Sequence, residues 1–99
     1  MRVMYRYEIE YKNPDNDATD LRLRELRVVD ETEKTLVVED WSRRRRVLKD
    51  SLNGYAHLTK EDALDHLIRR TRKRISWYEF WTEECNNALK LAEELKQAS

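Results

Sequence analysis

The sequence predicts an α+β fold, a four-stranded antiparallel meander packed against one long C-terminal helix. Two observations predict it. Residues 1–12 alternate between apolar and charged side chains, and residues 59–98 contain no Gly or Pro and repeat their apolar residues every three or four positions. Because 99 residues enclose one small core, we assign a single domain over 1–99, with the sheet in 1–58 and the helix in 59–98.

The first predicted strand has the clearest pattern. One side of it is apolar or aromatic, and the other side is charged except for Met4. Alternation with a period of two, carried by β-branched and aromatic residues, is typical of a half-buried strand. Its apolar side consists of Val3, Tyr5, Tyr7, Ile9 and Tyr11. The segment 13–17 contains Pro14 between Asx residues and predicts the turn that ends the strand.

Three more strands are predicted at residues 21–29, 34–39 and 44–49. In the first of these, Leu21 and Leu23 have one parity and Leu26 and Val28 the other. A β-bulge near residues 24–25 would bring the two halves onto one face.

The connections between these strands are polar. Residues 30–33 read as a hairpin connection, and a loop is predicted at residues 40–42. Asn53-Gly54 then follows the last strand, and this pair is common where a turn needs positive φ.

The long helix is predicted to begin after Thr59, a good N-cap residue that is followed by acids in the first turn. About 38 residues at roughly 1.5 Å each give a rod of nearly 60 Å, which is too long for a domain of this size. We therefore expect that the helix breaks near Ser76 or that its C-terminal half packs on another chain. Its apolar or small residues form a heptad seam: Leu64, Ile68, Thr71, Ile75, Tyr78, Thr82, Cys85, Leu89 and Ala92.

A second stripe lies beside this seam, basic in its N-terminal half and apolar in its C-terminal half. It contains His66, Arg70, Arg74, Trp77, Trp81, Ala88 and Leu95, with Leu91 next to it. One interpretation makes both tryptophans ordinary core under a wide sheet. The interpretation we favour is self-association, most simply as a two-fold dimer, because large apolar patches usually mark a contact surface. The predicted oligomer interface is Trp77, Trp81, Ala88, Leu91 and Leu95.

Charge is balanced but segregated. The chain has 20 basic and 20 acidic residues, whereas residues 43–74 hold eleven cations, mostly arginine, against four acids. Arginine binds phosphate through a planar fork of donors, and aromatic stacking beside basic groups suits nucleotides. The alternative is a solvated face, or pairing with the acids of the first three strands. The candidate anion site is Trp41, Arg43, Arg44, Arg45, Arg46, Tyr55, Arg69, Arg70, Arg74 and Trp77.

Catalytic and metal chemistry is not predicted. The sequence has no Gly-rich phosphate loop, no Cys or His pair at metal spacing and no nucleophile-elbow serine. We expect no enzyme activity, no metal and no cofactor, and we expect the single cysteine, Cys85, to be a small buried hydrophobe. The chain has no membrane-spanning run and no leader, and one cysteine suits a reducing compartment. A soluble, cytoplasmic protein is expected.

The segment 45–75 resembles a set of small bacteriophage accessory proteins. In them an Arg-rich strand precedes an aromatic-Ala-x-x-Thr-Lys-Glu-x-Ala-Leu helix start that is followed by basic residues. The matching residues are Tyr55, Ala56, Thr59, Lys60, Glu61, Ala63, Leu64, Ile68 and Arg69. The resemblance covers about a third of the chain and implies a class rich in inhibitors of host immunity, which bind a host protein or sequester a nucleotide messenger.

These observations predict a non-enzymatic binding protein, a phage-type counter-defence factor that captures an anionic nucleotide in Arg/aromatic pockets of a homo-oligomer. Two alternatives stay open. One is a protein–protein inhibitor of a host enzyme, with exposed tryptophans as anchors. The other is single-stranded nucleic-acid binding, which a salt series would test.

Overall fold

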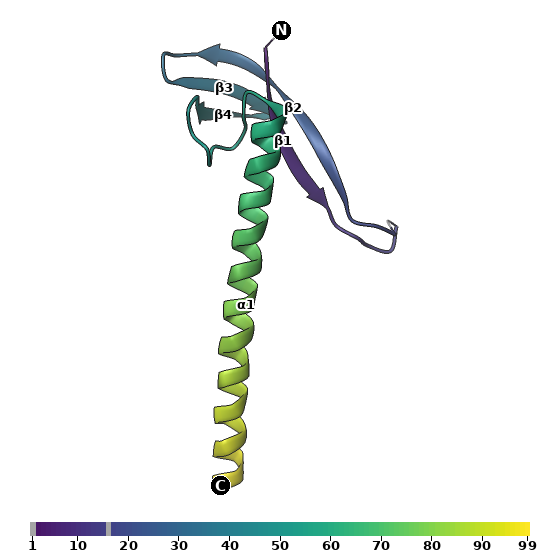
Figure 1. Cartoon of the computed structure of the whole chain (residues 1–99), viewed down its shortest axis with the longest axis vertical. Coiled ribbons are helices and arrows are strands. Elements are labelled where there is room, and N and C mark those ends of the chain that lie inside the picture. Colours follow the sequence, from purple (N-terminus) through teal and green to yellow (C-terminus); the bar gives the residue numbers. More distant parts are fainter. Residues whose placement is uncertain (1, 16) are drawn as a thin grey trace. The chain divides into compact units, whose positions relative to one another are not determined.

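The computed structural model describes residues 2–15 and 17–99. Its four strands are β1 (Val3–Glu10), β2 (Asp20–Glu31), β3 (Thr35–Asp40) and β4 (Arg43–Leu48), and its helix is α1 (Lys60–Ala98). The strands form one antiparallel sheet in the order β1-β2-β3-β4 (Figure 1). The α+β class and the meander are confirmed. The chain divides into two compact units, one ending at Ile68 and the other comprising Arg69–Ser99, and each is described by itself.

The core of the first unit lies on the side of β1 that the alternation marked as charged. Met4, the one apolar residue there, is 1% exposed, whereas Tyr5 and Tyr7 on the opposite side are only half-buried. The apolar side of the alternation is thus half-buried, and the core lies on the other side. The core cluster takes residues from all four strands and from the segment before the helix: Met4, Leu26, Leu36, Val38, Val47 and Ala56.

β2 joins the two halves of the sheet. Its residues 20–27 pair with β1 in unbroken register, and its C-terminal end pairs with β3. The bulge lies between Val28 and Asp30, so the bulge predicted near residues 24–25 is wrong. Residues 20–27 need no bulge, because their two kinds of side chain lie on different faces of the sheet. Leu21 and Leu23 pair with Ile9 and Tyr7 on one face, and charged residues pair with charged residues on the other.

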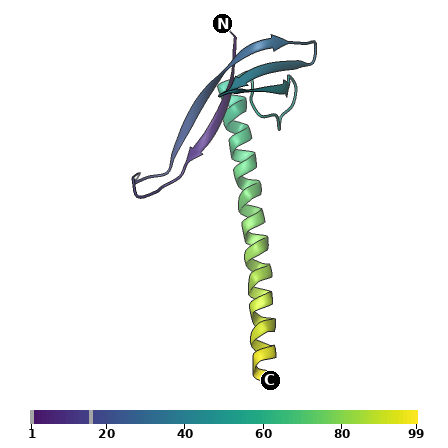
Figure 2. The same ribbon diagram turned by 180° about the vertical axis from the view of Figure 1, so that it is seen from behind.

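β3 and β4 form a tight hairpin, seen from behind in Figure 2. The turn contains Trp41, whose φ of 59° makes it the one non-glycine residue with positive φ among the described residues. Gly54 does not have positive φ, so the left-handed residue expected at Asn53-Gly54 lies instead in the β3–β4 turn. The turn expected at 13–17 is present, since Asn13 Oδ1 accepts the Asp15 N–H at 2.8 Å; Asn16 lies outside the described residues.

The helix begins where the sequence predicts. Thr59 Oγ1 accepts the N–H of Asp62 at 3.1 Å, and Lys60 is the first helical residue. The segment before it lies along the outer edge of β1, where Tyr5 and His57 exchange two backbone hydrogen bonds. The buried helix residues are Ala63, His66 and Leu67.

The heptad seam is not the buried face of the first helical turns. Leu64 is 36% exposed and Ile68 is 41% exposed, while His66, assigned by its spacing to the second stripe, is buried with its ring 4.9 Å from that of His57. The buried side of these turns is formed instead by Ala63, His66 and Leu67, which are three and four positions apart along the helix.

The second unit, Arg69–Ser99, is helical to Ala98 without a break at Ser76. The break proposed there is therefore absent, and Ser76 Oγ donates to the carbonyl of Arg72 within the helix. Cys85 is exposed, which corrects its assignment as a buried hydrophobe. From residue 72 onward every residue is exposed in the single chain.

Candidate functional site

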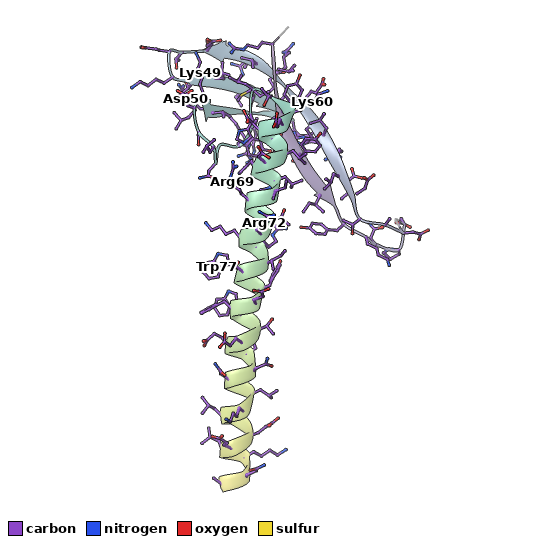
Figure 3. The ribbon with its side chains drawn as sticks, in the orientation of Figure 1. Lys49, Asp50, Lys60, Arg69, Arg72 and Trp77 are labelled. Carbon is purple, nitrogen blue, oxygen red and sulfur yellow. The ribbon has the colours of Figure 1, made fainter. Side chains whose placement is uncertain are left out.

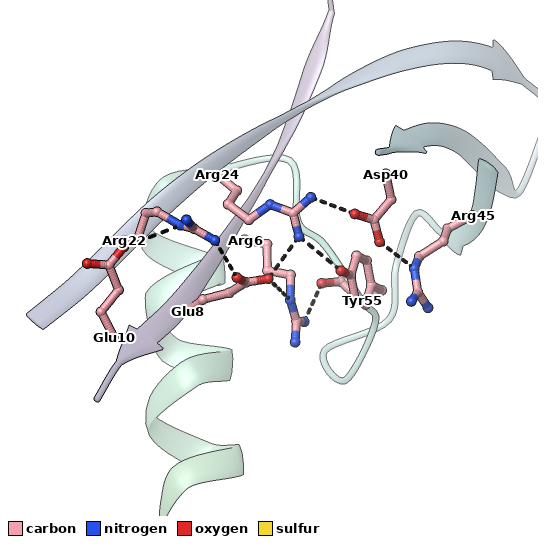
Figure 4. A network of polar contacts seen from close by, with 8 residues as sticks. All are labelled: Arg6, Glu8, Glu10, Arg22, Arg24, Asp40, Arg45 and Tyr55. Carbon is pink, nitrogen blue, oxygen red and sulfur yellow. Dashed lines mark hydrogen bonds and ion pairs between the residues drawn. The ribbon is translucent and has the colours of Figure 1, made fainter. Parts of the chain in front are cut away.

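A network of charged side chains occupies the core face of the sheet beyond Met4 (Figure 4). Arg24 on β2 is its centre. Its guanidinium donates to Asp40 Oδ1 at 2.5 Å, to Glu8 Oε1 at 2.8 Å and to the Tyr55 hydroxyl at 3.2 Å. The side chains of Arg24 and Asp40 are 13% and 6% exposed. The sequence places these residues on one face because Arg24 is two positions from Leu26, which is buried.

Arginines at the rim of the network also contact the carboxylates of Asp40 and Glu8. Arg45 donates to the second oxygen of Asp40 at 2.7 Å. Arg22 and Arg6 approach Glu8 at 3.2 and 3.3 Å. Each buried charge of the network thus has a partner of opposite charge, which low-dielectric sites require.

The pKa values of these groups follow from their contacts. The hydrogen bond from Arg24 holds the pKa of Asp40 well below its ordinary value, with further lowering by Tyr55 and Arg45. Burial alone would raise the pKa of Glu8, but bonds from Arg24 and Arg22 outweigh it and lower that pKa. Burial alone would also lower the pKa of Arg24, yet Asp40 and Glu8 raise it above its usual value. All these groups are ionised at neutral pH.

Tyr55, a predicted stacking residue, is already engaged. The guanidinium carbons of Arg6 and Arg45 both lie 4.1 Å from the centroid of its ring, which Figure 4 shows between them. Arg6 also donates to the Tyr55 carbonyl at 2.8 Å. These contacts tie the loop before the helix to the sheet and occupy the ring that was expected to receive a ligand.

Trp41 differs from Tyr55. Its ring has one guanidinium near it, that of Arg24 at 5.5 Å, and the residue is 82% exposed. A groove of about 360 Å³ lies beside it, lined by Arg24, Arg27, Glu39 and Trp41 among others. A left-handed backbone costs a bulky residue about 1–2 kcal/mol, so the turn holds this indole in solvent at a conformational cost.

Strand alternation divides the four consecutive arginines of β4. Arg45 is opposite Val38 and Arg43 is opposite Asp40, so both lie on the face of the network. Arg44 and Arg46 lie on the other face, where Arg46 contacts Thr35 Oγ1 at 3.4 Å. The tract predicted as one site is therefore two pairs that point in opposite directions.

The remaining predicted ligand residues belong to the second unit. Arg69, Arg70, Arg74 and Trp77 lie in Arg69–Ser99, along which Figure 3 labels Arg69, Arg72 and Trp77. Arg69, Arg70 and Arg74 each take part in an interaction in this structure. The structure thus brings Trp41, Arg43, Arg45 and Tyr55 to one side of the sheet. That these four form one site with Arg69, Arg70, Arg74 and Trp77 stays a prediction.

The second unit carries an exposed aromatic surface. Trp77 is 54% exposed and Trp81 is 57% exposed, and the ring of Phe80 lies edge-on to both, at centroid distances of 6.0 and 5.6 Å. Leu91 and Leu95 are also exposed. We name these five residues the aromatic helix surface: Trp77, Phe80, Trp81, Leu91 and Leu95.

Phe80, Glu8 and Asp40 were not singled out from the sequence. Pairing of the arginines with acids of the first three strands was the alternative considered, and Arg45 with Asp40 is such a pair. Phe80 follows Trp77 by three positions, a spacing that places residues side by side on a helix. Asp40 had a weaker signal, since it lies two positions from the buried Val38, and Glu8 shares the parity of the buried Met4, four positions away.

No known protein family matches the chain, and no curated protein or solved structure compared with it does so either. Among the described residues, no helix has the length and apolarity to span a membrane, and no group of three or more His, Cys, Asp or Glu side chains is placed to hold a metal ion.

Proposed function

We propose that the chain is a non-enzymatic binding protein that assembles with itself through the aromatic helix surface. The observation that carries this proposal is the exposure of Trp77, Phe80 and Trp81 together on one stretch of helix. An aromatic side chain has roughly 150–250 Å² to bury, so half-exposed rings leave several hundred square ångströms of apolar area in contact with water. A patch of that size usually marks a contact surface.

The charge network supports the same proposal, because its arginines are already paired and are not free to bind a ligand phosphate. Arg24 and Arg45 are bound to acids, and Tyr55 is packed between guanidinium groups. These groups neutralise each other within the sheet, and a ligand phosphate would have to displace Asp40 from two arginines. Arg24, Arg45 and Tyr55 therefore serve the fold, and self-association falls to the helix.

The test is the mass of the chain in solution, measured by light scattering during size exclusion at tens of micromolar. We expect an oligomer for the wild type and a monomer for the Trp77→Glu, Trp81→Glu double variant. The matched control is Thr82→Glu with Asn86→Glu, which adds the same charge on the opposite side of the helix and should remain oligomeric. A monomeric wild type contradicts the proposal.

We propose a second function, capture of a planar anion such as a nucleotide beside Trp41. The observation that favours it is the left-handed backbone that holds an 82% exposed indole with the Arg24 guanidinium 5.5 Å from its ring, two positions before Arg43 in the chain. Strained backbone conformations concentrate at binding sites, and an indole next to guanidinium groups offers stacking together with charge.

Thermal shift against a panel of cyclic and linear nucleotides tests this second function. Ligand at 100 times its Kd stabilises the native state by about 2.7 kcal/mol. Trp41→Gly suits the left-handed position and should abolish the shift, while Trp81→Ala should leave it intact. If no nucleotide changes the melting temperature but the chain captures a host protein, the inhibitor alternative is favoured. Salt-sensitive binding of labelled single strands would favour nucleic-acid binding.

A further inference from the structure

We infer that two copies of the segment Arg69–Ser99 pair in antiparallel orientation, with the two-fold axis near residues 82–83. The inference rests on the proposed self-association and names the partner, a second copy of this helix, and its direction. Three properties of the helix support it: the order of its charges, the order of its large and small residues, and the position of Glu84.

Charge is distributed in blocks along the helix. Residues 69–74 contain five cations and no acid, whereas Glu93 and Glu94 form an acidic pair near the C-terminal end. An antiparallel partner whose acidic pair lies level with this basic block has its two-fold axis between Thr82 and Glu83. The arrangement sets the two basic blocks at opposite ends of the pair, each level with the segment of the other copy that holds Glu93, Glu94 and Lys96. A parallel partner would place five cations beside five cations, which is unfavourable.

Side-chain size matches in the register that the charges select. Trp77 lies level with Ala88 of the second copy, and Trp81 lies within one residue of the level of Cys85. Large residues opposite small ones allow two helices to approach closely and interdigitate. In a parallel pair each tryptophan would lie opposite the same tryptophan of the second copy, and Ala88 would lie opposite Ala88. The interface would then be crowded at the tryptophans and poorly filled at Ala88.

Glu84 lies among the apolar residues of this face. At 100° per residue it falls between Trp77 and Leu91 on the helix circumference. The antiparallel register sets it level with Trp81, whereas a parallel pair would set it beside the Glu84 of the other copy, with two carboxylates in an apolar seam. The antiparallel pair avoids that repulsion.

Spin-label distances on the full chain test the direction. Labels are placed outside the five residues of the aromatic helix surface, at Asn87→Cys or Gln97→Cys in a Cys85→Ala background. With about 1.5 Å per residue, the antiparallel pair separates the two copies of residue 87 by about 14 Å along the axis and those of residue 97 by about 44 Å. A parallel pair gives short distances at both positions, and that result would overturn the inference.

Charge reversal provides a second, label-free measurement. Glu94→Lys, on the flank of the interface, should weaken the antiparallel dimer several-fold, because a lysine then lies level with the basic block. The same change would leave a parallel dimer unaffected, since it exchanges one like-charged pair for another. A dimer with unchanged Kd thus overturns the direction but keeps the proposed function. A chain that is monomeric before any substitution removes both.

Discussion

Asp40 connects two arginines from different strands on the core face of the sheet. It accepts from Arg24 and Arg45 and is 6% exposed. Removal of one partner from a buried pair leaves an uncompensated charge, so we expect Asp40→Ala to lower the free energy of unfolding by about 3 kcal/mol. Urea denaturation measures the change. Glu39→Ala, which breaks the exposed pair with Arg27, should cost at most about 1 kcal/mol, and equal losses would contradict this account.

The same acids make stability depend on pH. The pKa values of Asp40 and Glu8 are lowered in the folded chain, so below their ordinary values, about 4, the unfolded chain binds more protons than the folded one. Their contribution is complete at neutral pH and is lost as the pH falls below about 4. Denaturation at a series of pH values should show this loss, and Asp40→Asn should flatten it. A loss between pH 6 and 8 would point to other groups.

Among individual residues, the sequence pattern identified exposed aromatics better than buried charges. Trp77 and Trp81 stood out because tryptophan at helical spacing is rare on a polar surface. Glu8 and Arg24 did not, because alternation treats every charged residue as solvent-facing. Their burial depends on mutual pairing across strands, which no pattern within one strand encodes.

The strands illustrate what element patterns can and cannot predict. Period and turn residues were sufficient to predict four strands and the start of the helix at Thr59. The inward face of β1 could not be predicted, because a strand with aromatic residues on one side and charges on the other offers no local sign that Met4 and an ion-pair network supply the core side. The position of the bulge also depends on where β2 changes partner, from β1 to β3.

Both edges of the sheet are protected in different ways. The outer edge of β1 is paired with residue 57, and the outer strand β4 carries four consecutive arginines. Positive charge on an edge strand opposes the addition of a further strand from another molecule. This protective role accounts for Arg44 and Arg46, which point away from the network.

Thr59 caps the N-terminus of the helix, and a single substitution tests this role. Thr59→Ala removes the side-chain acceptor of the Asp62 N–H and should cost about 1 kcal/mol. Ser76→Ala is the matched control, because Ser76 bonds within the helix and alanine is the better helix former there. Urea denaturation compares the two variants, and a loss as large for Ser76→Ala as for Thr59→Ala would refute the assigned cap.

For the whole molecule, self-association must appear in thermal stability. If the native state is an oligomer, the melting temperature rises with protein concentration by mass action. Calorimetry of the wild type over a hundredfold concentration range should show this rise, and the Trp77→Glu, Trp81→Glu variant should show none. A concentration-independent wild type would be incompatible with assembly through the aromatic helix surface.

The placement of the three tryptophans has a practical consequence. Each indole is more than half exposed in the single chain, so unfolding a lone protomer barely changes the polarity around any of them. Their emission wavelength therefore follows association and ligand capture rather than folding. Single-tryptophan versions of the chain would separate the two events, with Trp41 sensing the sheet turn and Trp77 or Trp81 sensing the joined helices.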